Sequence, residues 1–237
     1  MKISVVVPTY NHEKFVADAV ESALDQTHKA HEVIVVNDCS TDNTANILKD
    51  YGDKIKVITH TANKGLAASR NTGLMHVSKD ADYVLPLDSD DILKENSLEE
   101  VAKKAKETNA DIIGISFKTF GSTNAEVILV EEPTLEMFAT RGNMLAYCSA
   151  VKREVLLEVG GWNPRMDNVY RDAQGKQKGG YEDLHLWFNL LKLEKKIISI
   201  QEPLFVYRTS GDSMITESQQ HHNELMSHIQ NDFNVFQ

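Results

Sequence analysis

The chain has 237 residues, of which 41% are hydrophobic and 25% charged, and its formal net charge is −10. This length suits one large α/β domain, or a domain with a smaller second part, and the composition is ordinary for a globular protein. The negative charge argues against a protein that binds nucleic acid through phosphates, because no surplus of Lys and Arg is present to displace counterions.

Cysteine content and the N-terminus indicate a cytoplasmic chain. Cys39 and Cys148 are too few for a disulfide framework, and we expect buried thiols in a reducing compartment. Residues 1–4 lead directly into a predicted strand, so we expect no signal peptide, and no apolar stretch is long enough to span a bilayer. Contact with the inner face of a membrane and the oligomeric state stay open.

Apolar runs alternate with amphipathic segments along the first ninety residues. Short runs rich in β-branched residues predict strands at 3–7, 33–36, 55–59 and 83–87. Helical spacing between them predicts a helix that Asn11 caps and that ends near Leu24, a helix carrying Ile47 and Leu48, and a helix that follows the loop at Asn63 and runs through about Val77. This alternation predicts a parallel sheet with helices on both faces and a crevice at the carboxyl ends of its strands.

The pattern changes in the second half of the chain. A helix capped by Ser97 precedes a strand at 112–117, and shorter strands are predicted at 126–130 and 146–151. Helices are predicted at 135–140 and at 153–159, where Gly160 and Gly161 stop the helix, and another begins at Glu182. Two closing strands, 197–200 and 204–207, are joined by a turn with Pro203. We divide the chain into 1–115, 116–214 and a C-terminal helical tail, 215–237.

Three carboxylates lie within four residues at the end of the fourth strand, in Asp88-Ser89-Asp90-Asp91. Carboxylates this close raise one another's pKa unless a cation joins them, and a hard divalent ion prefers oxygen ligands. The alternative is an Asp-rich turn that caps the next helix. The residues alone leave both interpretations open.

Other charged residues also allow two interpretations. Glu182-Asp183 can cap a helix or place a rigid catalytic carboxylate, and Arg70 can form a surface salt bridge or recognise a phosphate or carboxylate. His221 and His222 are neighbours that would point apart on a helix, which disfavours a metal site. The chain has no G-x-G-x-x-G or G-x-S-x-G, so dinucleotide binding and Ser-His-Asp hydrolysis are disfavoured.

Six segments, in this order, resemble the family 2 glycosyltransferases of the GT-A fold: SVVVPTYN (4–11), VIVVNDCSTD (33–42), NKGLAASRN (63–71), LDSDD (87–91), GGW (160–162) and ED (182–183). The resemblance covers nearly the whole chain and implies an α/β fold with a Rossmann-like, mostly parallel central sheet flanked by helices and a smaller mixed acceptor-side half. It implies inverting transfer of a sugar from a nucleotide-diphosphate donor, most often a UDP-sugar, to a hydroxyl of a glycan, lipid-linked or polymer acceptor. The implied cofactor is Mn²⁺ or Mg²⁺.

Matching positions imply roles for individual residues. The implied nucleotide-sugar site comprises Pro8, Thr9, Tyr10 and Asn11 at the nucleoside, Asp38 at the base, Lys64 and Arg70 near the base or diphosphate, and Asp88, Ser89 and Asp90. Asp90 is the implied direct metal ligand, supported by Asp88 and Asp91. Asp183 matches the general base, with Glu182 beside it, and Gly161, Trp162 and Arg208 lie on the implied acceptor side.

The implied chemistry is coherent. A metal neutralises charge on the leaving nucleoside diphosphate, and a base on the other side of the anomeric carbon activates the incoming hydroxyl. Three departures stand out: Asn37 where the family commonly has Asp, a long stretch between Trp162 and Glu182, and Ser210 where the family often has His.

Two other functions stay open as alternatives. A nucleotidyltransferase should carry a Gly-rich, basic loop after its first strand, and residues 8–11 are not such a loop. A non-catalytic sugar-nucleotide binder is disfavoured by the intact acidic motif and by Asp183.

Overall fold

The computed structural model describes residues 1–168 and 181–209. The strands are β1 (Ile3–Thr9), β2 (Glu32–Asn37), β3 (Lys56–Thr59), β4 (Tyr83–Pro86), β5 (Ile92–Leu93), β6 (Ile112–Gly121), β7 (Glu126–Val127), β8 (Ala150–Lys152) and β9 (Ile197–Thr209). The α-helices are α1 (Val16–Leu24), α2 (Thr44–Lys49), α3 (Leu66–His76), α4 (Ser97–Thr108), α5 (Leu135–Arg141), α6 (Arg153–Glu158) and α7 (Glu182–Lys192), and short 3₁₀ helices span Gly52–Lys54 and Pro164–Asn168.

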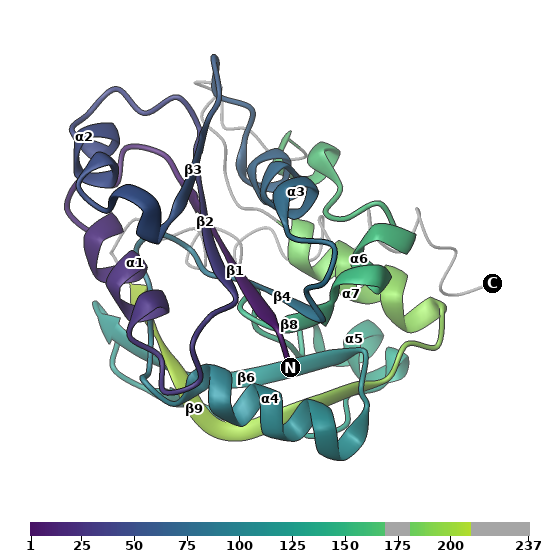
Figure 1. Ribbon diagram of the computed structural model, residues 1–237. Helices are drawn as coiled ribbons and strands as arrows, with labels where there is room; N and C mark the ends of the chain where they lie inside the picture. The colour runs from purple at the N-terminus through teal and green to yellow at the C-terminus, as the bar shows by residue number, and fades with distance from the viewer. Residues whose placement is uncertain (169–180, 210–237) are drawn as a thin grey trace.

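The described strands form one nine-stranded sheet in the order β3-β2-β1-β4-β8-β6-β9-β5, with β7 paired to β6. The first four strands in this order are parallel, as the alternation in the sequence predicts. Every residue of β1 is buried, because α1 and α2 cover one side of the parallel part and α3 covers the other (Figure 1). The predicted α/β fold is thereby confirmed.

Helix α3 packs directly on β1 through Gly73. A Cβ atom placed on Gly73 would lie 2.2 Å from Cγ1 of Val6. Any larger residue would therefore push α3 away from the sheet. This close packing fixes the position of Arg70 and Asn71, which lie one turn earlier on the same helix.

The second half adds antiparallel pairs to the sheet. β8 runs antiparallel to both β4 and β6, and β9 runs parallel to β6 over ten residue pairs. The predicted break at Pro203 is wrong, since β9 continues through it as one strand of 13 residues. The register shifts on both sides of Ser116, which faces Pro203, and this bulge accommodates a residue that has no N–H to donate.

Two predicted helix caps are also wrong. α1 begins only at Val16, and Asn11 instead adopts a left-handed conformation (φ 55°) in which its side chain accepts a hydrogen bond from the Thr41 N–H at 2.8 Å. Ser97 is the first residue of α4 rather than its cap, and its hydroxyl donates to the carbonyls of Lys94 and Leu204. Both side chains join segments that are distant in sequence instead of ending a helix.

The predicted bounds of several other elements can be compared with the observed ones. The strands predicted at 126–130 and 146–151 are shorter than expected, and β5 was not predicted. α6 ends as predicted before Gly160 and Gly161, both at φ 76°. The tail with His221 and His222, and also Ser210, lie outside the described residues.

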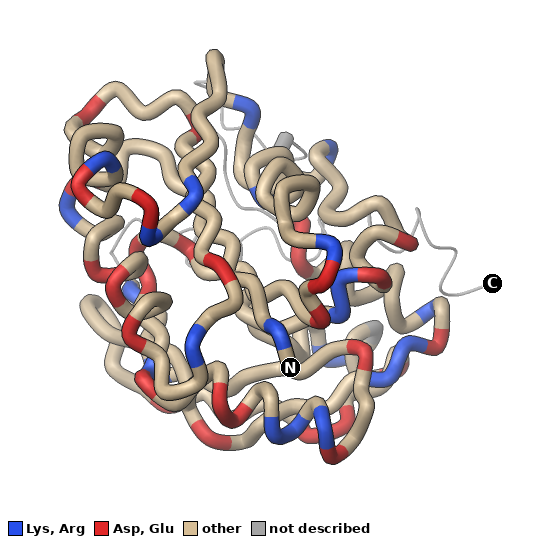
Figure 2. The backbone as a smooth tube through the Cα atoms, in the orientation of Figure 1, with Lys and Arg blue, Asp and Glu red and all other residues tan. Residues whose placement is uncertain are grey.

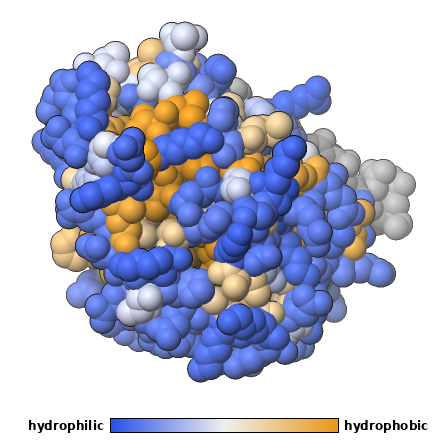
Figure 3. All heavy atoms as spheres, viewed as in Figure 1, coloured by the Kyte–Doolittle hydropathy of each residue, from blue (hydrophilic) through white to orange (hydrophobic). Residues whose placement is uncertain are grey.

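The charged residues of both signs are distributed as the acidic composition without a basic surplus predicts. Figure 2 shows Lys and Arg interspersed with Asp and Glu along the backbone, without a continuous basic band on the described part. An apolar area lies over the parallel half of the sheet in Figure 3, on the side of the edge strand β3, where Val57 is 40% exposed. Among the described helices, none has the length and apolar character that crossing a membrane requires.

Candidate active site

The acidic motif follows β4 and divides into two parts. Asp91 is almost fully buried, and its carboxylate is already engaged: Oδ1 accepts the Arg208 N–H at 2.7 Å and Oδ2 accepts the Tyr147 hydroxyl. Asp88 and Asp90 are partly exposed. Asp91 therefore ties the motif to β9. Asp90 and Asp88 are the more exposed carboxylates and can face a ligand, although Asp88 also pairs with Arg70 through Oδ1.

The electrostatics of the motif favour a cation. Burial, followed by the charge of Asp88, raises the pKa of Asp90. Burial, followed by the charges of Asp90 and Asp88, raises the pKa of Asp91 to about 8. A bound cation would relieve this repulsion between carboxylates.

The donor set suits a metal that is shared with a ligand. Nowhere in residues 1–168 and 181–209 do three or more His, Cys, Asp or Glu side chains converge as a metal cluster. Mg²⁺ and similar hard ions are commonly held by one or two carboxylates together with phosphate oxygens and water. Asp88 and Asp90 fit such an ion beside a diphosphate, so the residues present fit the implied cofactor in this form.

Arg70 connects this motif to α7. Its Nη2 lies 2.7 Å from Oδ1 of Asp88, and its Nη1 lies 2.5 Å from Oε1 of Glu182. Its guanidinium lies over the rings of Tyr147 and Trp162, at 5.1 and 5.9 Å from their centroids. Arg70 is 1% exposed, so the interpretation as a surface salt bridge is wrong.

Asp183 lies beside this ion pair in the first turn of α7. The residue that precedes the helix is Tyr181, so the interpretation of Glu182-Asp183 as the helix cap is wrong. Oδ2 of Asp183 accepts from the Asn143 amide at 3.0 Å, and Oδ1 accepts from the Leu184 N–H at 2.7 Å. Burial and then the charge of Glu182 raise the pKa of Asp183, and Arg70 opposes this rise. A carboxylate with a raised pKa suits a general base near neutral pH.

Asp38 organises the loop before α3. Its Oδ1 lies 2.6 Å from Nδ1 of His60, and its two oxygens accept the backbone N–H groups of Lys64 and Gly65 at 2.9 Å. The loop needs glycine here, because Gly65 has φ 93°. The structure thus brings Asp38 and the backbone of Lys64 together, and their assignment to a nucleoside site stays a prediction.

The residues at the end of β1 adjoin this loop, since the Asp38 N–H donates to the Thr9 carbonyl at 2.8 Å. Pro8 and Thr9 are buried, and the Thr9 hydroxyl has no hydrogen-bond partner among the described residues. Tyr10 is 45% exposed, and the neighbouring Asn11 N–H donates to the Ser40 hydroxyl at 3.0 Å. An open aromatic ring beside polar loops is a suitable surface for a nucleoside.

Three predicted acceptor-side residues have different surroundings. Gly161 and Trp162 are fixed by Asn71, which bonds the Trp162 N–H and carbonyl at 2.8 and 2.6 Å. A Cβ on Gly161 would lie 2.2 Å from Oδ1 of Asn71. Trp162 is buried under Arg70, whereas Arg208 lies at the acidic motif, with Nε donating to the Asp90 carbonyl at 2.9 Å.

Sequence reasoning missed five side chains of the site. They are His12, His60, Asn71, Asn143 and Tyr147. Nδ1 of His12 lies 2.7 Å from the hydroxyl oxygen of the buried Ser89. His12, His60 and Asn71 stand in or near the matched segments, so proximity could have indicated them. Asn143 and Tyr147 lie where the sequence has no periodic pattern, and nothing in it marks them.

Comparison with known proteins decides the family. The protein-family model described as Glycosyl transferase family 2 matches residues 4–185 of the sequence. The chain belongs to this family. It is therefore a glycosyltransferase by descent, and its relative EpsE of Bacillus subtilis is 31% identical over 224 residues, which cover 90% of this chain and 74% of EpsE.

Solved structures establish the GT-A fold. The structure of S. aureus TarS 1-349 in complex with UDP-GlcNAc superimposes with a TM-score of 0.74 at 23% identity, covering 97% of this chain and 65% of that one. The mannosyltransferase PcManGT from Pyrobaculum calidifontis, in complex with GDP-Man and Mn²⁺, has a TM-score of 0.69 at 17% identity and covers 95% and 64%. The chain thus spans less than two thirds of either neighbour's length.

Proposed function

We propose that this glycosyltransferase moves a sugar, with inversion, from a nucleotide-diphosphate donor to a hydroxyl of a glycan, lipid-linked or polymer acceptor. The observation that carries the proposal is the ion pair of Arg70 with Asp88 and Glu182. It brings the acidic motif, which suits a diphosphate and its cation, next to Asp183, which suits a base. A UDP-sugar is the proposed donor, in keeping with UDP-GlcNAc in the TarS complex.

The donor would bind across the ends of β1, β2 and β4. Tyr10, with Pro8, Thr9 and Asn11, would contact the nucleoside, while Asp38 and Lys64 would hold the base. Asp90 and Asp88 would hold Mn²⁺ or Mg²⁺, in keeping with Mn²⁺ in the PcManGT complex. When bound, the cation supplies neutralisation of the charge on the leaving diphosphate.

Asp183 would take the proton of the acceptor hydroxyl. The Asn143 amide holds one of its oxygens, and the environment that raises its pKa makes it a stronger base than an exposed aspartate. As the hydroxyl oxygen bonds to the anomeric carbon, the bond to the diphosphate breaks on the opposite side. This single displacement inverts the anomeric configuration, and the acceptor proton ends on Asp183.

A thermal-shift panel of nucleotide-sugars, with and without Mn²⁺, tests the proposal. Ligand at one hundred times its Kd stabilises a protein by about 2.7 kcal/mol, so the correct donor class should stand out. We expect UDP-sugars to raise Tm more than GDP-sugars, and only with the metal. Release of UDP in the presence of the stabilising donor then measures turnover. No shift with any nucleotide-sugar, or equal shifts without metal, would contradict the proposal.

A further inference from the structure

Arg70 is a buried cation between two carboxylates from distant parts of the chain. Asp88 follows it by 18 positions and Glu182 by 112. Both terminal nitrogens of the guanidinium are used by these two carboxylates, and the side chain is 1% exposed. It has little surface left with which to contact a nucleotide.

Two aromatic rings in contact with the Arg70 guanidinium are themselves held by hydrogen bonds. One ring in contact is that of Tyr147, whose hydroxyl accepts the Asp88 N–H at 3.2 Å and donates to Asp91. The other is that of Trp162, whose backbone is bonded twice by Asn71. Two consecutive residues of α3, Arg70 and Asn71, therefore bind α7 and the Gly161-Trp162 segment respectively.

We propose that Arg70 is a positioning residue that aligns the first turn of α7, and with it Asp183, against the acidic motif, without contacting the nucleotide. The planar fork of arginine suits this task, because it can donate in two diverging directions at once, which the single ammonium of lysine cannot do with the same geometry. The role of Asp183 as the base rests on the proposed function. The alignment itself rests only on the contacts described here.

The test compares Arg70→Lys, Glu182→Gln and the double variant. Hydrogen exchange of the α7 first turn, UDP·Mn²⁺ affinity by calorimetry, and kcat with KM for the donor are measured for each. In Arg70→Lys we expect faster exchange in the first turn of α7 and a kcat about 100-fold lower, as for a reactive group misplaced by about 1 Å. In the same variant, UDP·Mn²⁺ affinity and donor KM should stay within about twofold of wild type. The kcat of the double variant should lie within about twofold of the kcat of Arg70→Lys, because the two residues act through one contact.

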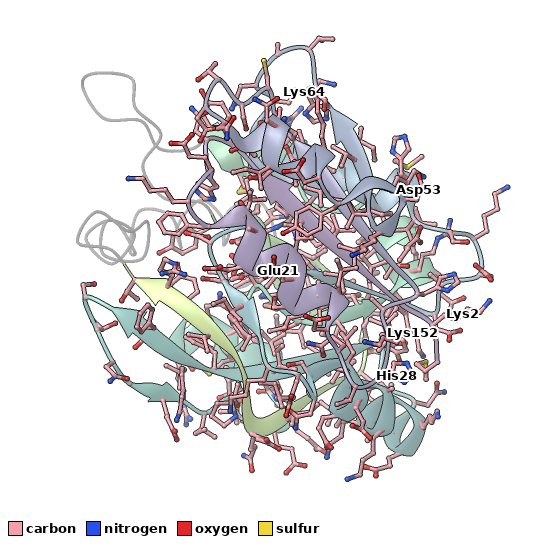
Figure 4. The ribbon with its side chains drawn as sticks, turned by 60° about the vertical axis from the view of Figure 1, so that its left-hand side comes forward. Lys2, Glu21, His28, Asp53, Lys64 and Lys152 are labelled. Carbon is pink, nitrogen blue, oxygen red and sulfur yellow. The ribbon has the colours of Figure 1, made fainter. Side chains whose placement is uncertain are left out.

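Lys152→Met provides the matched control. It breaks another ion pair, in which Lys152 Nζ lies 2.9 Å from Asp111 Oδ1. Figure 4 shows Lys152 well apart from Lys64, which lies on the loop before α3. This control should lose some stability and keep kcat, donor KM and α7 exchange unchanged.

Three results would overturn the proposal. A tenfold or greater loss of UDP·Mn²⁺ affinity in Arg70→Lys would make Arg70 a ligand contact. Additive losses of kcat in the double variant would show that Arg70 does not act through Glu182. Unchanged α7 exchange in both single variants would show that the pair aligns nothing.

The readouts separate this proposal from the proposed function. Hydrogen exchange needs no turnover, so it reads the alignment even if the wild type transfers no sugar. Should Arg70→Lys fail to fold, Glu182→Gln removes the negative charge from the same pair with a side chain of equal shape, and it must show the same direction of change in exchange. A wild type that binds and turns over no nucleotide-sugar would refute the proposed function alone.

Discussion

Replacing Tyr147 with Phe tests whether Asp91 supports the fold or faces a ligand. The change removes the hydroxyl that donates to Asp91 and accepts from the Asp88 N–H at 3.2 Å. The ring remains, so the contact with Arg70 at 5.1 Å and the contact with Phe205 at 5.8 Å are kept and no cavity forms. The loss is therefore that of hydrogen bonds to a buried carboxyl group.

The size of this loss should depend on pH. Below the raised pKa of Asp91, about 8 without metal, the carboxyl group is neutral, and a neutral hydrogen bond contributes about 1 kcal/mol. Above it the group is charged, and the bond contributes about 1.5–3 kcal/mol. The loss should be larger at high pH because the hydrogen bond from Tyr147 lowers the pKa of Asp91, which means that it stabilises the charged form of the carboxyl group more than the neutral form. A folded pKa above the unfolded one also means that Asp91's own contribution is lost as pH rises through about 8.

Urea unfolding at pH 6 and pH 9, in EDTA, measures both values. Tyr83→Phe is the control, because its hydroxyl donates to the Ala110 carbonyl at 2.5 Å and its pKa is raised to about 12, so neither group titrates in this range. We expect Tyr83→Phe to cost the same at both pH values and Tyr147→Phe to cost more at pH 9. An equal cost of Tyr147→Phe at the two pH values would refute the assignment of Asp91 as its buried acceptor.

Four further outcomes are expected. Asp183→Asn should lower transfer at least 100-fold, a typical general-base contribution of about 10²–10⁴, and leave UDP·Mn²⁺ binding intact; an unchanged rate would show that another group is the base. In the wild type, kcat/KM should fall with decreasing pH well above the ordinary aspartate range of about 4, because burial and Glu182 raise the pKa of Asp183, and a profile flat down to that range would contradict this. Asp90→Asn should weaken Mn²⁺-dependent UDP binding in calorimetry, whereas Asp91→Asn should keep it, since the Asp91 oxygens are held by Tyr147 and Arg208. Weaker binding in Asp91→Asn with unchanged binding in Asp90→Asn would make Asp91 the metal ligand instead. Gly73→Ala should destabilise the fold by about 1–3 kcal/mol through the contact with Val6, and a melting curve identical to wild type would show that α3 can shift at no cost.

The parallel half was predictable because its strands are buried on both faces. Such strands read as unbroken β-branched runs, and β1 and β2 stand out for this reason. The second half follows no such rule. β9 crosses Pro203 by means of a bulge opposite Ser116, which depends on the partner strand and cannot be read from β9 alone.

The site divides in the same way. Asp88, Asp90 and Asp183 could be named as candidates from the sequence because they stand in segments that resemble those of the family. The environment of Arg70 could not be predicted, since an arginine in the first turns of a helix is usually exposed, and only the packing of α3, α7 and Tyr147 buries it. The same holds for Asp91, whose position in the motif suggests a ligand but whose oxygens bind β9 and Tyr147.

The two carboxylates that pair with Arg70 lie at very different distances from it in sequence, so they are made at different times during synthesis. At roughly 5–20 residues per second, the ribosome adds Glu182, 112 positions later, about 6–22 s after Arg70. Asp88 follows by only 18 positions, so it is made while α7 does not yet exist. The carboxylate nearer in sequence is thus available to Arg70 before Glu182 and the proposed base are made, so one half of this ion-pair network can form first.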